Sequence, residues 1–234
     1  MPKKRNNHFL RVVVATLLCL ALLLYLGRQQ GPPTQRGAYE RHPKNSSSRN
    51  TPASCDALPL DATASIPLRQ ANRPLLGRCS VHMSRGYPIP DPNCTPGAIN
   101  PTLTAEVLRD PDFRTSCVRG QDTSQHEKAE TYDWYGIEHP HNNSGQSQTC
   151  ELDHLVSLEL GGADTLDNIW PECGPSDTDL RERYFKRKDL VENYLARQVK
   201  EGKIDLAVAQ RGIAGDWTQY LADAGEYCKN DRCD

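Results

Sequence analysis

The stretch from Cys150 to Cys173, CELDHLVSLELGGADTLDNIWPEC, combines an acid–acid–histidine cluster, a Gly-Gly turn and a single asparagine, with a cysteine at each end. Hydrolysis of a phosphodiester needs an activated water, a cation on the phosphate oxygens and stabilisation of the leaving alkoxide. His154 is the candidate general base, because an imidazole titrates near neutral pH. A lone histidine in a strand is more often structural, but its acidic and glycine-rich surroundings favour the catalytic interpretation.

Two short strands are expected to carry this cluster. The first begins at Cys150, where apolar and polar residues alternate imperfectly, and the second covers NIWPE and ends at Pro171. GGADTLD forms the loop between them, and its glycines permit backbone angles that residues with a β-carbon resist. Asn168 begins the returning strand, where its amide is expected to bond backbone across the hairpin and to hold the His154 loop in place.

A helix is predicted after the hairpin. From Thr178 to Val199 the apolar residues keep one face, and that face comprises Leu180, Tyr184, Val191 and Leu195. A second helical stretch runs from Ile204 to Ala224, and Gly212 and Gly215 weaken its middle.

The segments before the hairpin are less regular. SQHEKAETYDWY, residues 124 to 135, predicts a helix capped by Ser124, and a short helix is expected to start at Thr102 or Thr104. Residues 87 to 101 contain five prolines, which predicts irregular backbone that wraps the core. Together these elements predict an α+β domain over residues 55–234, with its core at 150–200.

Two strands followed by a helix form a ββα unit, and ELDHLVSLELGG…DN resembles the first two elements of the HNH, or ββα-metal, endonucleases. That family shows an acid–His pair, a Gly-Gly turn, an Asn on the returning strand and a metal ligand on the helix. YPIPDPNCTPGAINP, WYGI, KDLVE and AQRGIAGDW further resemble exported bacterial HNH-like proteins. The resemblance implies an HNH-like fold and a metal-dependent nuclease that cleaves DNA or RNA.

The metal ligands follow partly from this resemblance, which makes Asp153 one of them. Asp153 and His154 are neighbours on a strand and would point to opposite faces, so a twist or bulge is expected that lets the pair straddle the metal. The family usually has a histidine on the helix, and this helix has none. Glu192 borders the apolar stripe and is preferred as the second ligand, with Asp189 next. Such oxygen ligands suit Mg²⁺, with Mn²⁺ or Zn²⁺ as alternatives.

A basic run, RERYFKRK, lies on the same helix and includes Arg187 and Lys188, the candidate phosphate-binding residues. The alternative is a solvated helix face paired with its own acids. The chain has a formal charge of -2, which argues against a protein that coats nucleic acid through charge alone. A local cleft for nucleic acid remains compatible with that charge.

Eight cysteines follow the N-terminal segment, and an even set in an exported chain predicts disulfides in an oxidising compartment. Cys150 and Cys173 flank the hairpin and are predicted to pair with each other. Cys228 and Cys233 either close a small loop or hold the C-terminus to the body. A zinc site on Cys150 and Cys173 is the alternative, but it needs two more ligands and the chain has no CxxC pair.

The N-terminus predicts export. A basic tail precedes an apolar run from Val12 to Leu26, which is either an uncleaved signal-anchor or the core of a signal peptide. The anchor is preferred, because no small-x-small cleavage pattern follows the run. Residues 1–27 would then comprise a cytoplasmic basic tail and the membrane-anchoring segment, residues 28–54 would form a disordered tether, and the domain would be periplasmic or secreted.

The sequence therefore leaves three alternative functions open. The preferred one is an HNH-type nuclease with His154 as base, Asn168 as the residue that orients it, and a divalent cation. The second is a non-catalytic exported ββα module that binds a partner. The third is a zinc-stabilised structural protein.

Overall fold

The computed structural model describes residues 55–70, 77–120, 123–229 and 233, and all of these belong to a unit that spans residues 50–234. The predicted anchor, residues 12–26, and the predicted tether, residues 28–54, lie outside the described residues. No helix among the described residues is long and apolar enough to cross a membrane. The described unit mixes helices with small sheets and has the α+β character that the sequence predicts.

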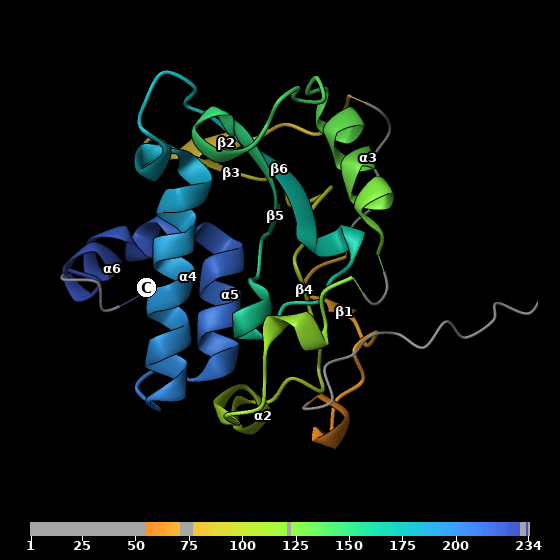
Figure 1. The fold of residues 1–234 in the computed structure, drawn as a ribbon, viewed down its shortest axis with the longest axis vertical. Helices are drawn as coiled ribbons and strands as arrows, with labels where there is room; N and C mark the ends of the chain where they lie inside the picture. The colour runs from red at the N-terminus through yellow and green to blue at the C-terminus, as the bar shows by residue number, and fades with distance from the viewer. Residues whose placement is uncertain (1–54, 71–76, 121–122, 230–232, 234) are drawn as a thin grey trace, which may run out of the picture. The chain divides into compact units, whose positions relative to one another are not determined.

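Among the described residues there are three sheets, and each has two antiparallel strands. β1 (Ile66–Pro67) pairs with β4 (Ala98–Ile99), and β2 (His82–Ser84) pairs with β3 (Tyr87–Ile89). The longest pair is β5 (Cys150–His154) with β6 (Ile169–Cys173), which lies between helices α3 and α4 (Figure 1). This hairpin carries the residues that the sequence singled out.

The helix at residues 124–135 is confirmed. α3 (Gln125–Tyr135) begins at a capping box, in which the Ser124 hydroxyl accepts a hydrogen bond from the Glu127 amide and the Glu127 carboxylate accepts one from the Ser124 amide. Thr104 caps the short α2 (Ala105–Arg109), at one of the two starts expected from the sequence. Both helices therefore start where a side chain satisfies their free amide groups.

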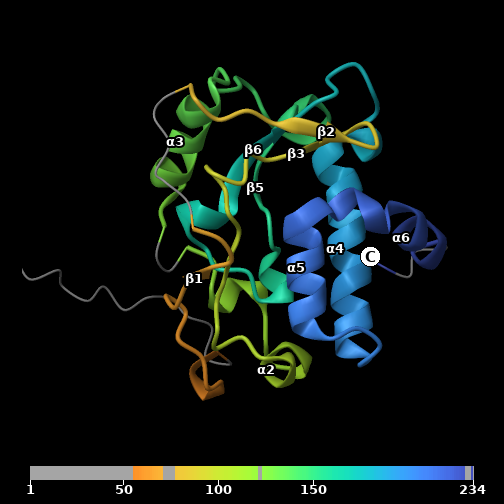
Figure 2. The same ribbon diagram turned by 180° about the vertical axis from the view of Figure 1, so that it is seen from behind.

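The long helix is shorter than predicted at its start. α4 (Tyr184–Lys200) is preceded by a 3₁₀ turn at Leu180–Glu182. Leu180 therefore lies outside the helix, and its side chain is only partly buried. Its buried apolar stripe is Phe185, Val191, Leu195, Ala196 and Val199. The helical region at residues 204–224 is divided into α5 (Leu206–Asp216), a 3₁₀ turn at Trp217–Tyr220 and α6 (Leu221–Tyr227). Figure 2 shows α4 and α5 side by side, as in the opposite view.

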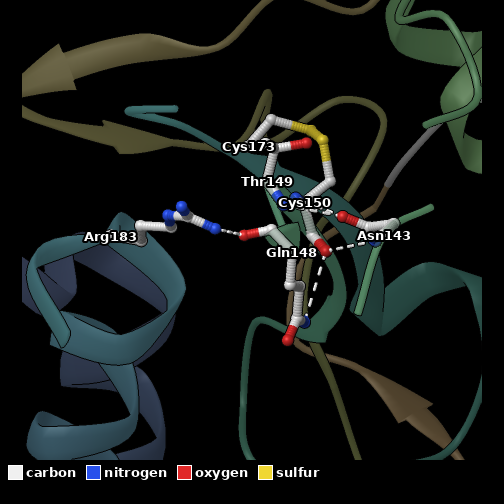
Figure 3. Close-up of a disulfide and its surroundings, with 6 residues drawn as sticks. All are labelled: Asn143, Gln148, Thr149, Cys150, Cys173 and Arg183. Carbon is white, nitrogen blue, oxygen red and sulfur yellow. Dashed lines mark hydrogen bonds between the residues drawn. A yellow bond between two sulfur atoms is a disulfide. The ribbon is translucent and has the colours of Figure 1, made fainter. Parts of the chain in front are cut away.

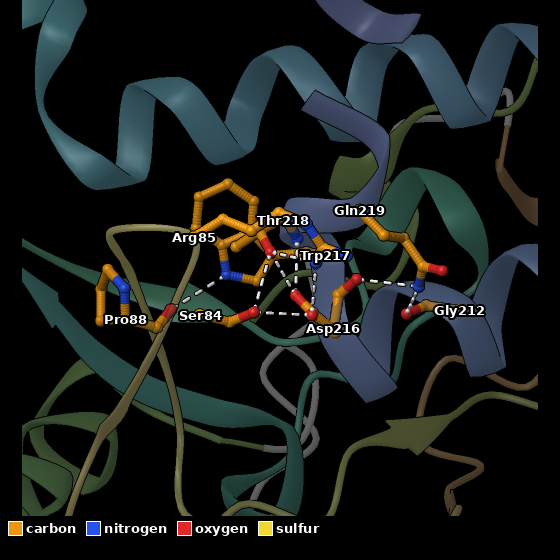
Figure 4. Close-up of polar contacts among 8 residues, drawn as sticks. All are labelled: Ser84, Arg85, Pro88, Gly212, Asp216, Trp217, Thr218 and Gln219. Carbon is orange, nitrogen blue, oxygen red and sulfur yellow. Dashed lines mark hydrogen bonds and ion pairs between the residues drawn. The ribbon is translucent and has the colours of Figure 1, made fainter. Parts of the chain in front are cut away.

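A group of polar contacts, called the polar corner below, explains why helix α5 ends at Asp216. The Asp216 carboxylate accepts a hydrogen bond from the Thr218 amide, at 3.0 Å, and so caps the turn that follows. Ser84 and Arg85 from the β2–β3 turn also bind this carboxylate, each at 2.8 Å (Figure 4). Trp217 is fully buried and donates its indole N–H to the Pro88 carbonyl at 3.1 Å. The corner therefore ties the proline-rich segment to the C-terminal helices.

The proline-rich segment wraps the core as predicted, although it also contributes β3 and β4. Ile89, Cys94 and Ala98 are buried there. The core has two clusters: a larger one that includes Trp170, Val191, Leu195 and Trp217, and a smaller one around Leu103, Leu108 and Phe113. All eight described cysteines form disulfides, namely Cys55–Cys117, Cys79–Cys94, Cys150–Cys173 and Cys228–Cys233. These bonds indicate an oxidising, exported environment.

Candidate functional site

The loop between β5 and β6 is held by Asn168. This fully buried amide donates hydrogen bonds to the carbonyls of Val156 and Ala163, at 2.8 and 2.9 Å, and its oxygen accepts one from the Val156 amide at 2.9 Å. Asn168 therefore bridges the two ends of the loop that follows His154. Only a side chain with both a donor and an acceptor can make this set of bonds.

Two glycines shape the same loop for different reasons. Gly161 has φ of +74°, in the left-handed region where a β-carbon is strained. Gly162 has no such angle, but a β-carbon on it would lie 1.8 Å from the Val156 carbonyl oxygen. Only the first glycine thus meets the expectation about backbone angles. The second is required by close packing of the loop against itself.

The β5–β6 register is continuous, from Cys150 opposite Cys173 to His154 opposite Ile169. The bulge expected at Asp153 and His154 is therefore wrong: the two side chains follow normal alternation and point to opposite faces of the hairpin. Asp153 contacts helix α4, and His154 lies toward helix α3.

On the α3 face, His154 belongs to a buried polar network. Its Nε2 lies 2.7 Å from Oδ1 of Asp164, in the loop, and the same carboxylate oxygen lies 2.5 Å from Nζ of Lys128 on α3. The Gly120 amide donates to the other oxygen of Asp164. All three side chains are almost completely buried. One carboxylate thus accepts from two side chains and one amide.

The charges on this face favour an ionised aspartate. Burial alone would raise the pKa of Asp164, but hydrogen bonds from His154 and Lys128 outweigh it and hold the pKa at about 2. Burial lowers the pKa of His154, against the opposing effect of Asp164. The imidazole is therefore kept neutral at moderate pH and is oriented through Nε2.

On the α4 face, Lys188 lies at the centre of a second network. Its side chain is fully buried, and its Nζ lies 2.7 Å from Oδ2 of Asp153 and 2.7 Å from the His154 carbonyl oxygen. Glu192, one turn further along α4, accepts a hydrogen bond from the same ammonium. Burial acts to lower the pKa of Lys188, but Asp153 and Glu192 outweigh it and raise the pKa. The ammonium therefore stays charged inside the domain.

Glu172 adds a further acid to this face. It lies opposite Glu151 in the register, two residues from the position opposite Asp153, and so projects from the same side of the hairpin. Its side chain is fully buried, and neither carboxylate oxygen accepts a hydrogen bond from the described residues. Buried carboxylates normally have such donors. Glu172 instead has the carboxyl group of Asp153 as its hydrogen-bond partner, which requires one of the two groups to carry a proton.

The carboxyl groups on this face outnumber the positive charges, and their pKa values are raised. Burial, followed by the nearby Asp153, raises the pKa of Glu172 well above its ordinary range. Burial raises the pKa of Glu192 in the same way, against the lowering effect of Lys188. Glu151, at the more exposed edge, has its pKa raised to about 7 by burial and by Asp153. Asp153, Glu172 and Glu192 therefore lie around one ammonium, that of Lys188.

The basic run on α4 is divided between structural and exposed roles. Lys188 was expected to bind phosphate, but its ammonium is fully buried and bound to three oxygens, so that interpretation is wrong for this structure. Arg187 is half-buried and lines a surface pocket with Lys186 and Asn193. It remains the candidate for phosphate. Asp189, the second choice for a metal ligand, pairs with Lys186 at 2.6 Å instead.

The disulfide predicted between Cys150 and Cys173 is present and joins the open ends of the hairpin (Figure 3). Asn143 accepts hydrogen bonds from the amides of Thr149 and Cys150, at 2.7 and 3.0 Å. The buried guanidinium of Arg183 donates to the Gln148 carbonyl and so connects the hairpin to the start of α4. Because both cysteines are oxidised, the alternative zinc site on their thiolates is wrong.

Three residues of these networks carried no role in the sequence-based prediction. Glu172 lies two residues after Trp170 on β6, so alternation along the strand places both side chains on the same face. That reasoning identifies the partners of Glu172 only when the strand register is known. Lys128 lies in a helix whose pattern is mostly polar, so nothing in the sequence marks it as buried. Asp164, in GGAD, was assigned only to the loop. Their partners come from distant segments and emerge only in three dimensions.

Among the described residues, no group of three or more Asp, Glu, His or Cys side chains is arranged so that it could hold a metal ion. The search of family models found no match to the chain, and comparisons with curated proteins and solved structures found no significant match either. The site is therefore interpreted from its own geometry.

Proposed function

We propose that this protein is an exported, metal-dependent phosphodiesterase that cleaves DNA or RNA and belongs among the HNH-like ββα proteins. The observation that carries the proposal is the charge imbalance at the junction of β5, β6 and α4. Asp153, Glu172 and Glu192 are three carboxyl groups beside a single ammonium. Leaving such charge unpaired in a protein interior is costly, and a divalent cation would offset it.

The ligand atoms at this junction are of the type that suits a hard divalent cation such as Mg²⁺, whereas their present spacing among the described residues does not hold one. All the donors are oxygens, from carboxylates and the His154 carbonyl, and oxygen is the ligand that Mg²⁺ and Mn²⁺ prefer. Asp153 and Glu192 keep 9 % and 13 % of their side-chain surface exposed, which gives an ion a route from solvent. When bound, the cation would neutralise charge on the phosphate and on the leaving oxygen.

The protein's own groups supply the remaining roles. Asp164 binds Nε2 of His154, so Nδ1 is the nitrogen proposed to take a proton from the attacking water, which requires that water to reach the ring from the face of the hairpin opposite to the carboxyl groups. Lys128 keeps Asp164 ionised and so fixes the orientation of the imidazole. Asn168 fixes the loop that carries Asp164 relative to the strand that carries His154. Arg187 is the residue proposed to bind a substrate phosphate.

A cleavage assay tests this function. The purified domain is incubated with plasmid DNA and with single-stranded RNA in Mg²⁺, in Mn²⁺ and in EDTA. We expect cleavage that EDTA stops, and His154→Ala should reduce its rate about a thousandfold, since general-base catalysis contributes roughly 10²–10⁴. His139→Ala is the matched control, because His139 is exposed on the surface, where it lies beside Asp133 and Tyr132. Equal rates for wild type and His154→Ala would exclude the catalytic role.

A second candidate is a non-catalytic binding module on the same scaffold. Two observations favour it: Lys188 already supplies a cation to Asp153 and Glu192, and His154 points to the opposite face of the hairpin. This candidate predicts no cleavage of either nucleic acid in any metal. The same assay therefore separates the two functions.

A further inference from the structure

A pocket on the surface of α4 is not explained by the hairpin networks. It lies between the 3₁₀ turn at Leu180–Glu182, one side of α4 and the Cys228–Cys233 disulfide, and its volume is about 420 Å³. The disulfide follows α6, which lies beside α4 (Figure 1). Sites that enclose small molecules have volumes of roughly 300–1,000 Å³. This cavity, called the α4 pocket below, is therefore large enough for one unit of a polymer such as a nucleotide.

Two arginines line the α4 pocket without an acidic partner in the part of the chain that the structure describes. Arg181 is exposed, and Arg187 is half-buried, with an Nε that is buried and has no hydrogen-bond partner among the described residues. Asp189, an acid of the same pocket, pairs with Lys186 at 2.6 Å instead. Because buried donors normally have an acceptor, Arg187 has donor capacity that a bound anion would use.

The lining of the α4 pocket has a positive charge in a chain that is acidic overall. Its described ionisable side chains are three basic ones, Arg181, Lys186 and Arg187, and two acidic ones, Glu182 and Asp189. One positive charge is left over, whereas the whole chain has a formal charge of -2. A phosphodiester carries one negative charge, and the planar guanidinium of arginine can bind two phosphate oxygens at once. The pocket thus matches a phosphodiester in charge and in the type of donor.

Other groups in the α4 pocket suit a nucleobase. Leu190 lines it, and Sγ of Cys228 lies 3.9 Å from the Leu190 carbonyl oxygen, so the leucine and the disulfide form its apolar part. Asn193 has an amide that both donates and accepts hydrogen bonds, as the edge of a base requires. A base that is paired in a duplex cannot enter a concave pocket unless it leaves the stack. The pocket therefore favours a strand whose bases are unpaired.

From these contacts we infer that the α4 pocket is a nucleotide subsite for single-stranded nucleic acid, in which Arg181 and Arg187 bind one phosphodiester group and Asn193 binds the adjoining base. The inference rests on the proposed function and names its substrate as unpaired DNA or RNA. Lys186 connects the subsite to the hairpin, because it lines the pocket and its Nζ lies 3.9 Å from Oε2 of Glu151 on β5. A strand held in the pocket therefore passes beside the α4 face of the hairpin.

Binding of fluorescently labelled oligonucleotides in EDTA tests the subsite without cleavage. The full-length, disulfide-bonded chain is titrated with a short oligo(dT), a short oligo(U) and a duplex of equal length, and binding is followed by fluorescence anisotropy. We expect at least one single strand to bind about tenfold more tightly than the duplex, because a paired base must first be unstacked. The ratio of the two single-strand affinities identifies the preferred sugar. A duplex that binds as tightly as both single strands overturns the inference.

Arg187→Gln is the decisive variant. We expect it to weaken binding of the preferred single strand about tenfold, since a charge-assisted hydrogen bond to phosphate is lost. The slope of log affinity against log salt should also decrease by roughly 0.7, the value for one phosphate contact on a single strand. Arg211→Gln is the matched control, because Arg211 is exposed on α5 and does not line the pocket, and it should change the affinity less than about threefold. Equal affinities in Arg187→Gln and wild type overturn the inference.

Two further variants keep the test valid if Arg187→Gln does not fold. Arg181→Gln changes an exposed side chain and should weaken single-strand binding in the same way. Asn193→Ala should weaken binding of the normal strand by roughly three- to tenfold and leave an abasic strand of equal length unaffected. Equal losses for the normal and the abasic strand would show that Asn193 does not contact a base. Unchanged affinity in Arg181→Gln would exclude the pocket as a phosphate site.

The binding assay and the cleavage assay fail independently. Pocket-dependent binding in a chain that cleaves neither nucleic acid overturns the nuclease and leaves the subsite standing. Cleavage by a chain whose binding no pocket variant changes overturns the subsite and leaves the nuclease standing.

Discussion

The two faces of the β5–β6 hairpin each hold a buried lysine from a helix, yet their charges are balanced differently. On the α3 face, one carboxylate, Asp164, accepts hydrogen bonds from Lys128 and His154, and its pKa is lowered. On the α4 face, Lys188 faces several carboxyl groups, and the pKa values of Glu172 and Glu192 are raised. The first network is complete with protein groups alone, whereas the second lacks positive charge. Incomplete electrostatic pairing thus distinguishes a candidate binding site from a network that only positions a side chain.

The largest effects should come from removing the two lysines separately. Lys128→Met leaves Asp164 buried without its ion pair, and breaking such a pair costs about 3–5 kcal/mol of unfolding free energy. Lys188→Met should cost a similar amount in EDTA, and Mn²⁺ should restore much of it. Chemical denaturation of both variants, with and without Mn²⁺, measures the difference. Recovery of Lys128→Met in Mn²⁺ would contradict the distinction between the faces.

A smaller effect concerns the titration of Asp164. Its folded-state pKa of about 2 lies below the ordinary value of 3.8, so its contribution to stability is present above about pH 4 and is lost as the pH falls toward 2. That contribution amounts to about 2 kcal/mol. Carboxyl ¹³C resonances recorded against pH measure the midpoint directly. We expect a midpoint near 2 in wild type and an upward shift in Lys128→Met. A wild-type midpoint at 3.8 or higher would show that the α3-face network is not paired as described.

The smallest effect on stability is expected for an exposed ion pair, which serves as the reference for the buried pairs. Arg85 lies 2.8 Å from Asp216, and its side chain is 59 % exposed. Such surface pairs contribute roughly 0–1 kcal/mol because solvent screens them. Arg85→Gln should therefore change the midpoint of denaturant unfolding only slightly. A loss comparable to that of Lys128→Met would mean that this corner is as important for stability as the hairpin networks.

The sequence predicted the elements better than their contacts. Ser124 and Thr104 cap helices where the local pattern indicated, and Cys150 pairs with Cys173, because caps and a hairpin disulfide depend on neighbouring residues. The start of α4 was misplaced, since Leu180 continues the apolar period into a 3₁₀ turn.

The contacts of the candidate site could be predicted only in part. The alternation of side chains along β5 and β6 determines which of them share a face. The prediction instead assumed a bulge at Asp153 and His154, and the strand register contains none. Lys188 was read as a surface cation because it lies within a basic run. Its burial depends on the packing of α4 against the acids of the hairpin, which are 16 to 35 positions earlier in the chain. Helical periodicity alone contains no information about such partners.

The connectivity of the disulfides has a consequence for how the protein can be produced. Cys79–Cys94 lies inside the loop that Cys55–Cys117 closes, while Cys150–Cys173 and Cys228–Cys233 join consecutive cysteines. A chain oxidised in the order of its translocation would join Cys55 to Cys79 first, and that error must later be reshuffled. Secretion strains that lack a disulfide isomerase should therefore accumulate scrambled protein, with the mispairing confined to Cys55, Cys79, Cys94 and Cys117.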